Sequence, residues 1–187
     1  MNELSLHILD VVQNSIKANA TLVQIVIKED RLNDLYTITI IDNGHGMDKS
    51  TLSTVSDPFF TTRTTRKVGM GVSLFKMAAE MTEGSFTIES EPNVGTTVTA
   101  VFGNSHIDRA PLGEIADTIG ILILNEQCID IYYEHIVANS SYVFDTREIK
   151  KVLDGIPFTN YDVMMWIKNN IKDGIDTIIE EEQTWNL

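Results

Sequence analysis

Side chains that could bind or transform a ligand occur at three places in the first half of the sequence. Asp42 follows an apolar run and precedes the turn Asn-Gly-His-Gly, where glycine lets a backbone approach a flat polar ligand closely. Asp10 and Asn14 are four residues apart and would share one face of a helix. Gly69 and Gly71 would leave backbone amides free at the start of a helix, which is a favourable site for phosphate. Together these residues suggest a ligand that carries both a flat polar ring and phosphate.

The elements that must position these residues can be predicted from the sequence pattern. Residues 5–18 are expected to form a helix that Ser5 caps, with the polar residues Asp10, Asn14 and Lys17 on one side. The opposite side is an apolar stripe made of Leu6, Leu9, Val12 and Ile16. Residues 22–29 and 35–41 alternate apolar and polar residues, which predicts two strands joined by a polar turn.

The next part of the chain predicts a loop, a helix and two more strands. Residues 48–68 have no long apolar period and are expected to be a loop. A helix should open near Gly69, continue through Met81 and end at Gly84. The stretches Ser-Phe-Thr-Ile-Glu-Ser-Glu and Gly-Thr-Thr-Val-Thr-Ala-Val-Phe should be two strands joined by a Pro-Asn-Val-Gly turn.

The order and spacing of these stretches resemble the GHKL ATP-binding family, which groups DNA gyrase, the ninety-kilodalton heat-shock chaperone, the mismatch-repair protein MutL and the sensor histidine kinases. The motifs that carry the resemblance are Asp and Asn on a helix, D-x-G-x-G, F-F-T-T-R, G-x-G-V and G-T-T. They occur in that order within residues 2–103. The resemblance implies an α+β fold, a two-layer α/β sandwich of the GHKL (Bergerat) type, with ATP between the helical layer and a lid.

The resemblance also implies roles for individual residues. Asp42 would accept a hydrogen bond from the exocyclic amine of adenine, with help from Thr96, and Asn14 would hold Mg²⁺ between the nucleotide phosphates. Residues 48–68 would form the lid, anchored by its aromatic pair, with Arg63, Arg66 and Lys67 as candidates for contacting the γ-phosphate. The full set expected to bind the cofactor is Asn14, Lys17, Asp42, Gly44, Gly46, Met47, Thr62, Arg63, Gly69, Met70, Gly71, Val72 and Thr96.

Three departures from the family pattern bear on the reaction. Asp10 stands where hydrolysing members carry a glutamate that activates water, and its side chain is one methylene shorter. Val72 replaces the usual leucine, and Lys17 replaces an acidic residue of MutL-type segments. The short lid favours the histidine-kinase or anti-sigma-kinase side of the family.

Three functions therefore stay open at this point. The chain could transfer the γ-phosphoryl group of ATP to a separate protein, hydrolyse ATP slowly with Asp10 as the base, or bind a partner under nucleotide control without catalysis. His7 lacks the neighbours expected of a phosphorylated histidine, and His45 is expected to be solvent-exposed. A homodimer is a further arrangement that the sequence leaves open.

The composition restricts the cellular compartment and the binding partners that we expect. The chain has 187 residues, is 43 % apolar and carries a net charge of −13, which disfavours nonspecific binding to nucleic acid or to anionic membranes. The single cysteine, Cys128, excludes an internal disulfide and is expected to pack as a thiol. Without an apolar signal region or a membrane-length apolar run, a stand-alone cytoplasmic protein is expected.

The resemblance ends near Asn104, so we expect an ATP-binding domain at 1–103 and a small α+β C-terminal domain of unknown role at 104–187. That second part should contain a helix at 114–124, a hairpin that turns at 139–141, and two helices, with residues 180–187 frayed. Asp145 should cap the first of these two helices and Gly155 should end it, while the second should run from 160 to 172. His135 is expected to be a packing residue.

Overall fold

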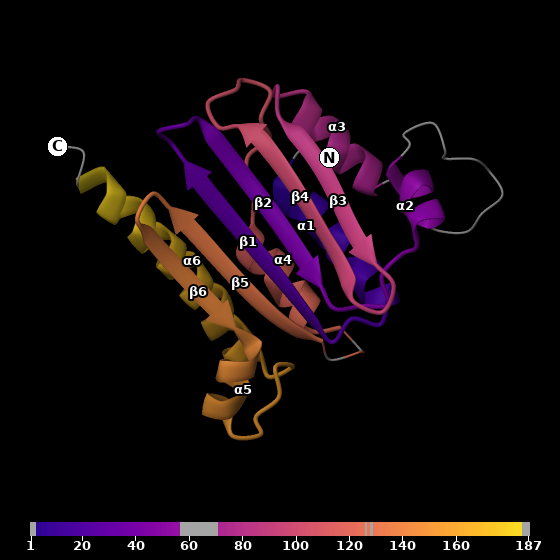
Figure 1. The fold of residues 1–187 in the computed structure, drawn as a ribbon. Helices are drawn as coiled ribbons and strands as arrows, with labels where there is room; N and C mark the ends of the chain where they lie inside the picture. The colour runs from indigo at the N-terminus through magenta and orange to yellow at the C-terminus, as the bar shows by residue number, and fades with distance from the viewer. Residues whose placement is uncertain (1–2, 57–70, 126, 128, 185–187) are drawn as a thin grey trace.

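The computed structural model describes residues 3–56, 71–125, 127 and 129–184. Its described strands form one six-stranded sheet in the order β3-β4-β2-β1-β5-β6 (Figure 1). All neighbouring strands are antiparallel except β1 and β5, which are parallel. The strands are β1 (Leu22–Asp30), β2 (Leu35–Asp42), β3 (Ser85–Glu91), β4 (Gly95–Gly103), β5 (Asp130–Val137) and β6 (Ser140–Asp145).

Helices cover one face of this sheet. Helices α1, α3, α4 and α6 lie behind the sheet in Figure 1, and the face turned toward the viewer carries no helix of the described part of the chain. The predicted two-layer α+β sandwich is therefore confirmed. The helices are α1 (Leu4–Lys17), α2 (Lys49–Ser56), α3 (Gly71–Glu80), α4 (Ile115–Ile123), α5 (Thr146–Leu153) and α6 (Tyr161–Thr184).

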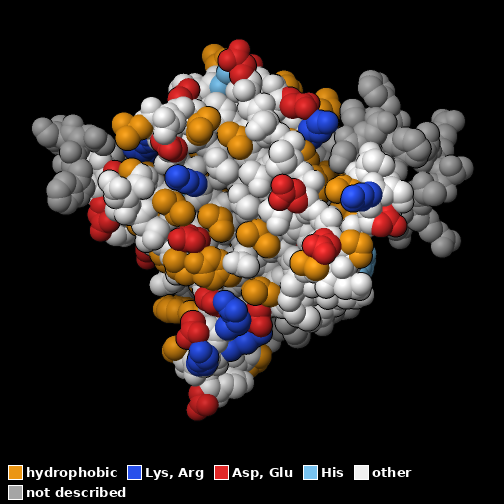
Figure 2. All heavy atoms as spheres, viewed as in Figure 1, with side chains coloured by type: hydrophobic (Ala, Val, Ile, Leu, Met, Phe, Trp, Pro, Cys, Tyr) orange, Lys and Arg blue, Asp and Glu red, His pale blue; other side chains and the backbone are white. Residues whose placement is uncertain are grey.

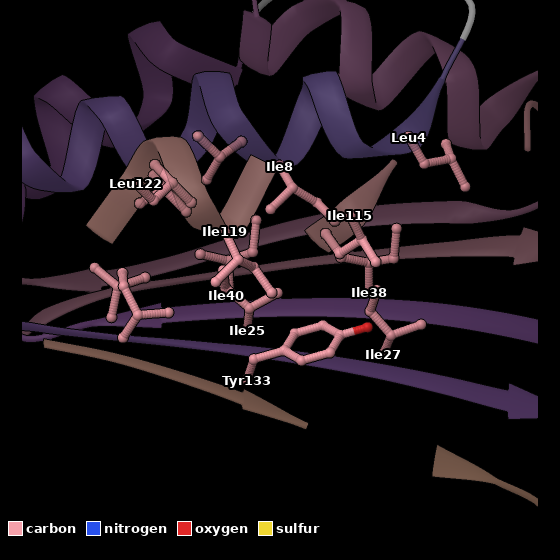
Figure 3. Close-up of a cluster of buried hydrophobic side chains, with 14 of the residues drawn as sticks. Leu4, Ile8, Ile25, Ile27, Ile38, Ile40, Ile115, Ile119, Leu122 and Tyr133 are labelled. Atoms are coloured by element: carbon pink, nitrogen blue, oxygen red, sulfur yellow. The ribbon is translucent and has the colours of Figure 1, made fainter. Parts of the chain in front are cut away.

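The hydrophobic core lies between the two layers because every second residue of the central strands points toward the helices. Ile25 and Ile38 are fully buried there and face Ile8 of α1 and Ile119 of α4 (Figure 3). Burying an aliphatic side chain of this size contributes about 1.5 to 3 kcal/mol. Residues on the opposite face of the sheet are partly exposed, and Figure 2 shows hydrophobic and polar side chains interspersed there.

The start of α1 differs from the prediction. The helix begins at Leu4, so Ser5 lies inside it, and its hydroxyl donates to Oε2 of Glu3 (3.5 Å) rather than capping the helix. The first backbone N–H groups, those of Leu4 and Ser5, donate instead to the carbonyl oxygens of Pro111 and Leu112. A distant loop thus satisfies the groups that a capping side chain would otherwise satisfy.

The buried face of α1 is also rotated from the predicted stripe. Leu6 is exposed, and Leu9 and Ile16 are only partly buried. The face that packs on the sheet and on α3 consists of Leu4, Ser5, His7, Ile8, Val11, Val12 and Ser15. Of the predicted stripe only Val12 is fully buried, and the small polar residues Ser5 and Ser15 belong to the buried face.

Residues 49–56 form the short helix α2, so the prediction of a loop from 48 onward is wrong for this segment. Asp48 precedes the helix and accepts hydrogen bonds from the backbone N–H of Thr51 (2.7 Å) and the hydroxyl of Ser50 (2.8 Å). The helix has only two turns, which is too short for an apolar period to be recognised in the sequence.

The C-terminal residues extend the same sheet. Strand β5 pairs with β1 from Leu22↔Asp130 to Glu29↔Val137, and β6 pairs with β5. Asp145 caps α5 as predicted, since its carboxylate accepts from the N–H of Arg147 (2.9 Å). The hairpin turn lies at residues 138–139, whereas 139–141 was predicted. Whether residues 1–103 form an independent domain stays a prediction.

Helix α6 is longer than predicted, because it continues past residue 172 to Thr184. Gly174 does not end the helix, and the ring of Tyr142 packs against it where a larger side chain would clash. Near the end of the helix, Glu182 accepts from the N–H of Asn139 (3.1 Å). Within the described ranges, no helix combines the length and the apolar character needed to cross a bilayer.

Candidate functional site

Three polar side chains form a row across one end of the sheet. Asp42 of β2 pairs with Thr96 of β4, and Thr96 pairs with Ser90 of β3. Alternate residues of each strand point toward the helical layer, and these three side chains belong to that set. The row therefore faces the space below α1, at the end of an otherwise apolar surface.

The carboxylate of Asp42 is held by two hydrogen-bond donors. The hydroxyl of Ser15 donates to Oδ2 (2.6 Å), and the backbone N–H of Gly44 donates to Oδ1 (2.9 Å). Each carboxylate oxygen can accept more than one hydrogen bond, so Asp42 retains capacity for a ligand. The two contacts fix its orientation between α1 and the glycine turn.

The glycine turn is pinned between α1 and the β3–β4 hairpin. His45 N–H donates to the carbonyl of Ala18 (2.9 Å), and Asn93 N–H donates to the carbonyl of His45 (2.8 Å). Gly46 has φ +65°, and a Cβ there would overlap the carbonyl of Glu91. A Cβ on Gly44 would lie 2.8 Å from the carbonyl oxygen of Ala18. Close packing of the protein's own backbone thus requires both glycines.

A cavity of about 220 Å³ opens beside the polar row. It brings together seven residues that the sequence singled out, namely Asn14, Lys17, Asp42, Gly46, Met47, Val72 and Thr96. Its apolar walls come chiefly from Val11, Val55, Ile88 and Val98, and the remaining lining residues are Ser15, Ala18, His45 and Thr51. A small cavity with apolar walls and one carboxylate suits a flat heteroaromatic ring.

A second hollow, of about 440 Å³, lies at the same end of the sheet and also borders Asp42 and Thr96. Apart from Ser90, its other residues come from the open face and the β3–β4 turn, and they include Glu89 and Glu91 but neither Asn14 nor Lys17. Two exposed acidic residues make it a poor place for phosphate. The smaller cavity under α1 is therefore the better candidate for a ligand that carries phosphate.

Asp10 lies beside the cavity rather than in its lining. Its side chain packs directly against Gly71, the first residue of α3, where a Cβ would come within 2.7 Å of Oδ2. Asn14 follows one helical turn later on α1 and does line the cavity. Asp10 therefore lies at the end of α3 whose backbone N–H groups could receive phosphate.

Several predicted residues lie outside the described part of the chain. They are Thr62, Arg63, Gly69 and Met70 of the expected cofactor set, together with the aromatic pair Phe59 and Phe60 and the basic residues Arg66 and Lys67. The lid and its phosphate contacts accordingly stay predictions.

Two contributors were not recognised in the sequence. Ser15 holds Asp42, and Ser90 accepts from the N–H of Met47 (2.8 Å) and lies 2.9 Å from Oγ1 of Thr96. The pairing of β3 with β4 could have indicated Ser90, because it places residue 90 opposite residue 96. Nothing in the sequence indicated that Ser15, rather than Asn14, faces Asp42.

The histidines fit the roles expected of them. His7 is 3 % exposed and stacks on Phe75 at 5.2 Å, so the ring is shielded from solvent, and burial lowers its pKa. His45 is exposed, as predicted. His135 is buried, contacts the hydroxyl of Tyr133 (2.8 Å) and lies 3.2 Å from Oε1 of Glu29. Burial opposes ionisation of Glu29, but the hydrogen bond from His135 holds its pKa below the usual value.

A two-layer sandwich with a polar row, a glycine turn and a small ring-sized cavity at one end of the sheet is the arrangement of a nucleotide-binding fold. Residues 2–105 match the family described as histidine kinase-, DNA gyrase B- and HSP90-like ATPase. The chain belongs to this family, and the predicted membership of the GHKL superfamily is confirmed. The family is one of ATPases, which implies that the chain binds ATP.

Curated relatives include a sensor protein kinase and a sensor protein. Over 110 residues, or 59 % of the chain, the sequence is 33 % identical to the sensor protein kinase FleS of Pseudomonas aeruginosa. Over 97 residues, or 52 % of the chain, it is 33 % identical to the sensor protein DegM of Bacillus sp. strain B21-2. The chain spans only 27 % of FleS and 26 % of DegM, so the similarity covers one segment of each of these longer proteins.

Solved structures share the fold. The crystal structure of the N-terminal domain of a DNA repair protein superposes with a TM-score of 0.52 and is 19 % identical. The match covers 76 % of this chain and 52 % of the other. At this level of identity the similarity establishes the fold alone. The superposed part of the chain is longer than the segment that matches the family, residues 2–105.

Proposed function

We propose that this chain binds ATP with Mg²⁺ in the cavity under α1 and transfers the γ-phosphoryl group to a separate protein. The observation that carries the proposal is the cavity itself, which gathers Asn14, Lys17, Asp42 and Thr96 from three elements. The similarity of 59 % of the chain to the sensor protein kinase FleS supports the phosphoryl transfer.

Adenine selection would rest on Asp42. Its carboxylate is restrained by Ser15 and Gly44, and an ionised carboxylate can only accept hydrogen bonds. It therefore favours a ring that presents an amino group, as adenine does, over one that presents a carbonyl. Val72, Ile88 and the other apolar lining residues would contact the faces of the ring.

The phosphates and the metal would lie toward Asn14 and Lys17. An amide oxygen is a suitable ligand for Mg²⁺, and the ammonium group of Lys17, at the exposed end of α1, adds the positive charge that phosphate needs. The described residues contain no group of three or more His, Cys, Asp or Glu side chains that would hold a metal without phosphate. Bound Mg²⁺ would neutralise charge on the phosphates during transfer.

Hydrolysis is the second candidate, and the position of Asp10 favours it. The carboxylate packs against the first residue of α3, one helical turn from Asn14, where a base could meet water near the phosphates. In that case the protein would act as a slow ATPase switch. In the third alternative the chain catalyses no reaction. It would bind a partner, or a second copy of itself, through residues 104–187 under the control of the bound nucleotide.

Incubation of the purified chain with Mg²⁺ and γ-labelled ATP tests these alternatives. Tight binding without phosphate release, followed by transfer of label to a protein from the same cells, is the expected result for the kinase. Free phosphate that disappears in Asp10→Asn would establish hydrolysis instead. Failure to bind ATP at all would overturn the proposal.

A further inference from the structure

Ser90 is the one hydroxyl group in the polar row that contacts three partners at once. Its Oγ lies 2.8 Å from the N of Met47, 3.0 Å from the carbonyl oxygen of Gly95 and 2.9 Å from Oγ1 of Thr96. It thus joins the glycine turn, the start of β4 and the residue that lies beside Asp42.

The direction of each of these hydrogen bonds follows from the chemistry of the groups. The N–H of Met47 can only donate, so Ser90 accepts there, and the carbonyl of Gly95 can only accept, so Ser90 donates its one hydrogen there. The contact with Thr96 is then completed only if Thr96 donates to the second lone pair of Ser90.

The reverse arrangement is less favourable. If Ser90 donated to Thr96, no hydrogen would lie between Oγ of Ser90 and the carbonyl oxygen of Gly95, 3.0 Å away. Two acceptors would then face each other in a partly buried place, where an unpaired polar contact is costly. The geometry therefore fixes the proton of Thr96 on the side of Ser90.

We infer that Ser90 is a positioning residue that makes the Thr96 hydroxyl an acceptor toward the cavity and thereby increases the selectivity of the site for a ring with an amino group. The inference rests on the proposed nucleotide site. With its hydrogen directed to Ser90, Thr96 presents only lone pairs to the cavity that it lines. Asp42, opposite Thr96 in the sheet, is a second acceptor, so a ring that presents a carbonyl would meet two acceptors.

Binding of ATP and of inosine triphosphate (ITP) tests the inference. The two nucleotides differ only at one edge of the ring, where ITP has a carbonyl group in place of the amino group and an N–H in place of the neighbouring acceptor nitrogen. In Ser90→Ala the Thr96 hydroxyl is free to turn and donate to that carbonyl. Loss of the contact to Met47 should lower both affinities alike, so the diagnostic quantity is the ratio of the two Kd values, measured by calorimetry.

We expect Ser90→Ala to reduce the preference for ATP over ITP by about 3- to 10-fold, the worth of one neutral hydrogen bond. Ser90→Thr keeps the hydroxyl and should keep the preference. Ser85→Ala removes an exposed serine from the other end of β3 and should leave the preference unchanged. If Ser90→Ala does not fold, Ser90→Cys takes its place, because a thiol is only a weak acceptor.

The hydrogen bond can also be measured without nucleotide. In urea unfolding, Ser90→Ala and Thr96→Val should be less destabilising together than the sum of the single effects, because either change removes the same contact. An unchanged Kd ratio in the alanine variant, or additive unfolding effects, would overturn the inference while the parent still binds ATP. A parent that binds neither nucleotide would overturn the proposed function as well.

Discussion

Replacing Asp42 with asparagine keeps the size of the side chain and removes its charge and one of its acceptors. In the parent, Oδ1 accepts from Gly44 N–H and Oδ2 accepts from Ser15. Asparagine has a single carbonyl oxygen, and its amide nitrogen would turn hydrogens toward the cavity. An adenine amino group would then face a donor instead of an acceptor.

The effect should appear in binding more than in folding. Ser15 already lies 3.5 Å from the carbonyl of Val11 and can donate there, so the unliganded protein loses little. In the complex, a buried donor left unpaired costs about 1 to 3 kcal/mol. At 1.4 kcal/mol per tenfold change, the Kd for ATP should rise by about 5- to 140-fold.

Isothermal titration calorimetry with Mg²⁺ and ATP measures this change, and thermal unfolding without nucleotide verifies that the variant folds. Asp30→Asn is a matched control, because Asp30 ends β1 at the opposite end of the sheet, where its carboxylate accepts hydrogen bonds from Asn33 of the nearby turn. A folded Asp42→Asn protein with the parent's Kd would refute the assignment of Asp42 to adenine.

Three further changes test other parts of the site and fold. Asn14→Ala should weaken binding of Mg-ATP but hardly change binding of ATP in EDTA; an equal loss in both titrations would exclude a metal role. A left-handed backbone conformation costs a residue other than glycine about 1 to 3 kcal/mol. Gly46→Ala should lower the free energy of unfolding by more than this amount, because the added Cβ would also overlap the carbonyl of Glu91. Gly155→Ala, with φ +91° and open space around it, isolates the strain in the same denaturation assay. A chain that ends after Gly103 should have a lower melting temperature than the whole chain, since β1 would lose its parallel neighbour; equal melting temperatures would favour an independent domain.

Local patterns in the sequence predicted the strands of the first half well. Apolar and polar residues alternate over residues 22–29 and 35–41. This pattern indicates strands reliably because one face of the sheet is buried and the other is not. The family motifs then singled out Asn14, Asp42 and Thr96, and the fold brings these three residues to one cavity, while their roles in binding stay predictions. Sequence spacing was sufficient here because the elements involved are regular and their order is that of the family.

Features that depend on distant contacts could not be predicted in this way. Ser5 was predicted to cap α1 from the local sequence alone. The groups that accept hydrogen bonds from the start of α1 are the carbonyls of Pro111 and Leu112, which are more than a hundred residues away and leave no local signal. The last helix was predicted to end at residue 172, but it continues to Thr184, and Gly174 within it packs against the ring of the distant Tyr142. The parallel pairing of β1 with β5 also depends on tertiary packing, since no short-range pattern specifies a partner strand.

The parallel β1–β5 pairing has a consequence for synthesis on the ribosome. Residue 22 pairs with residue 130, so the first four strands leave the ribosome long before the fifth. Until then β1 is an outer strand with a free hydrogen-bonding edge, a feature that invites pairing with a neighbouring nascent chain. Closing so large a loop also slows completion of the sheet. Translation speed across residues 104–137 should therefore influence how much of the protein reaches its native state.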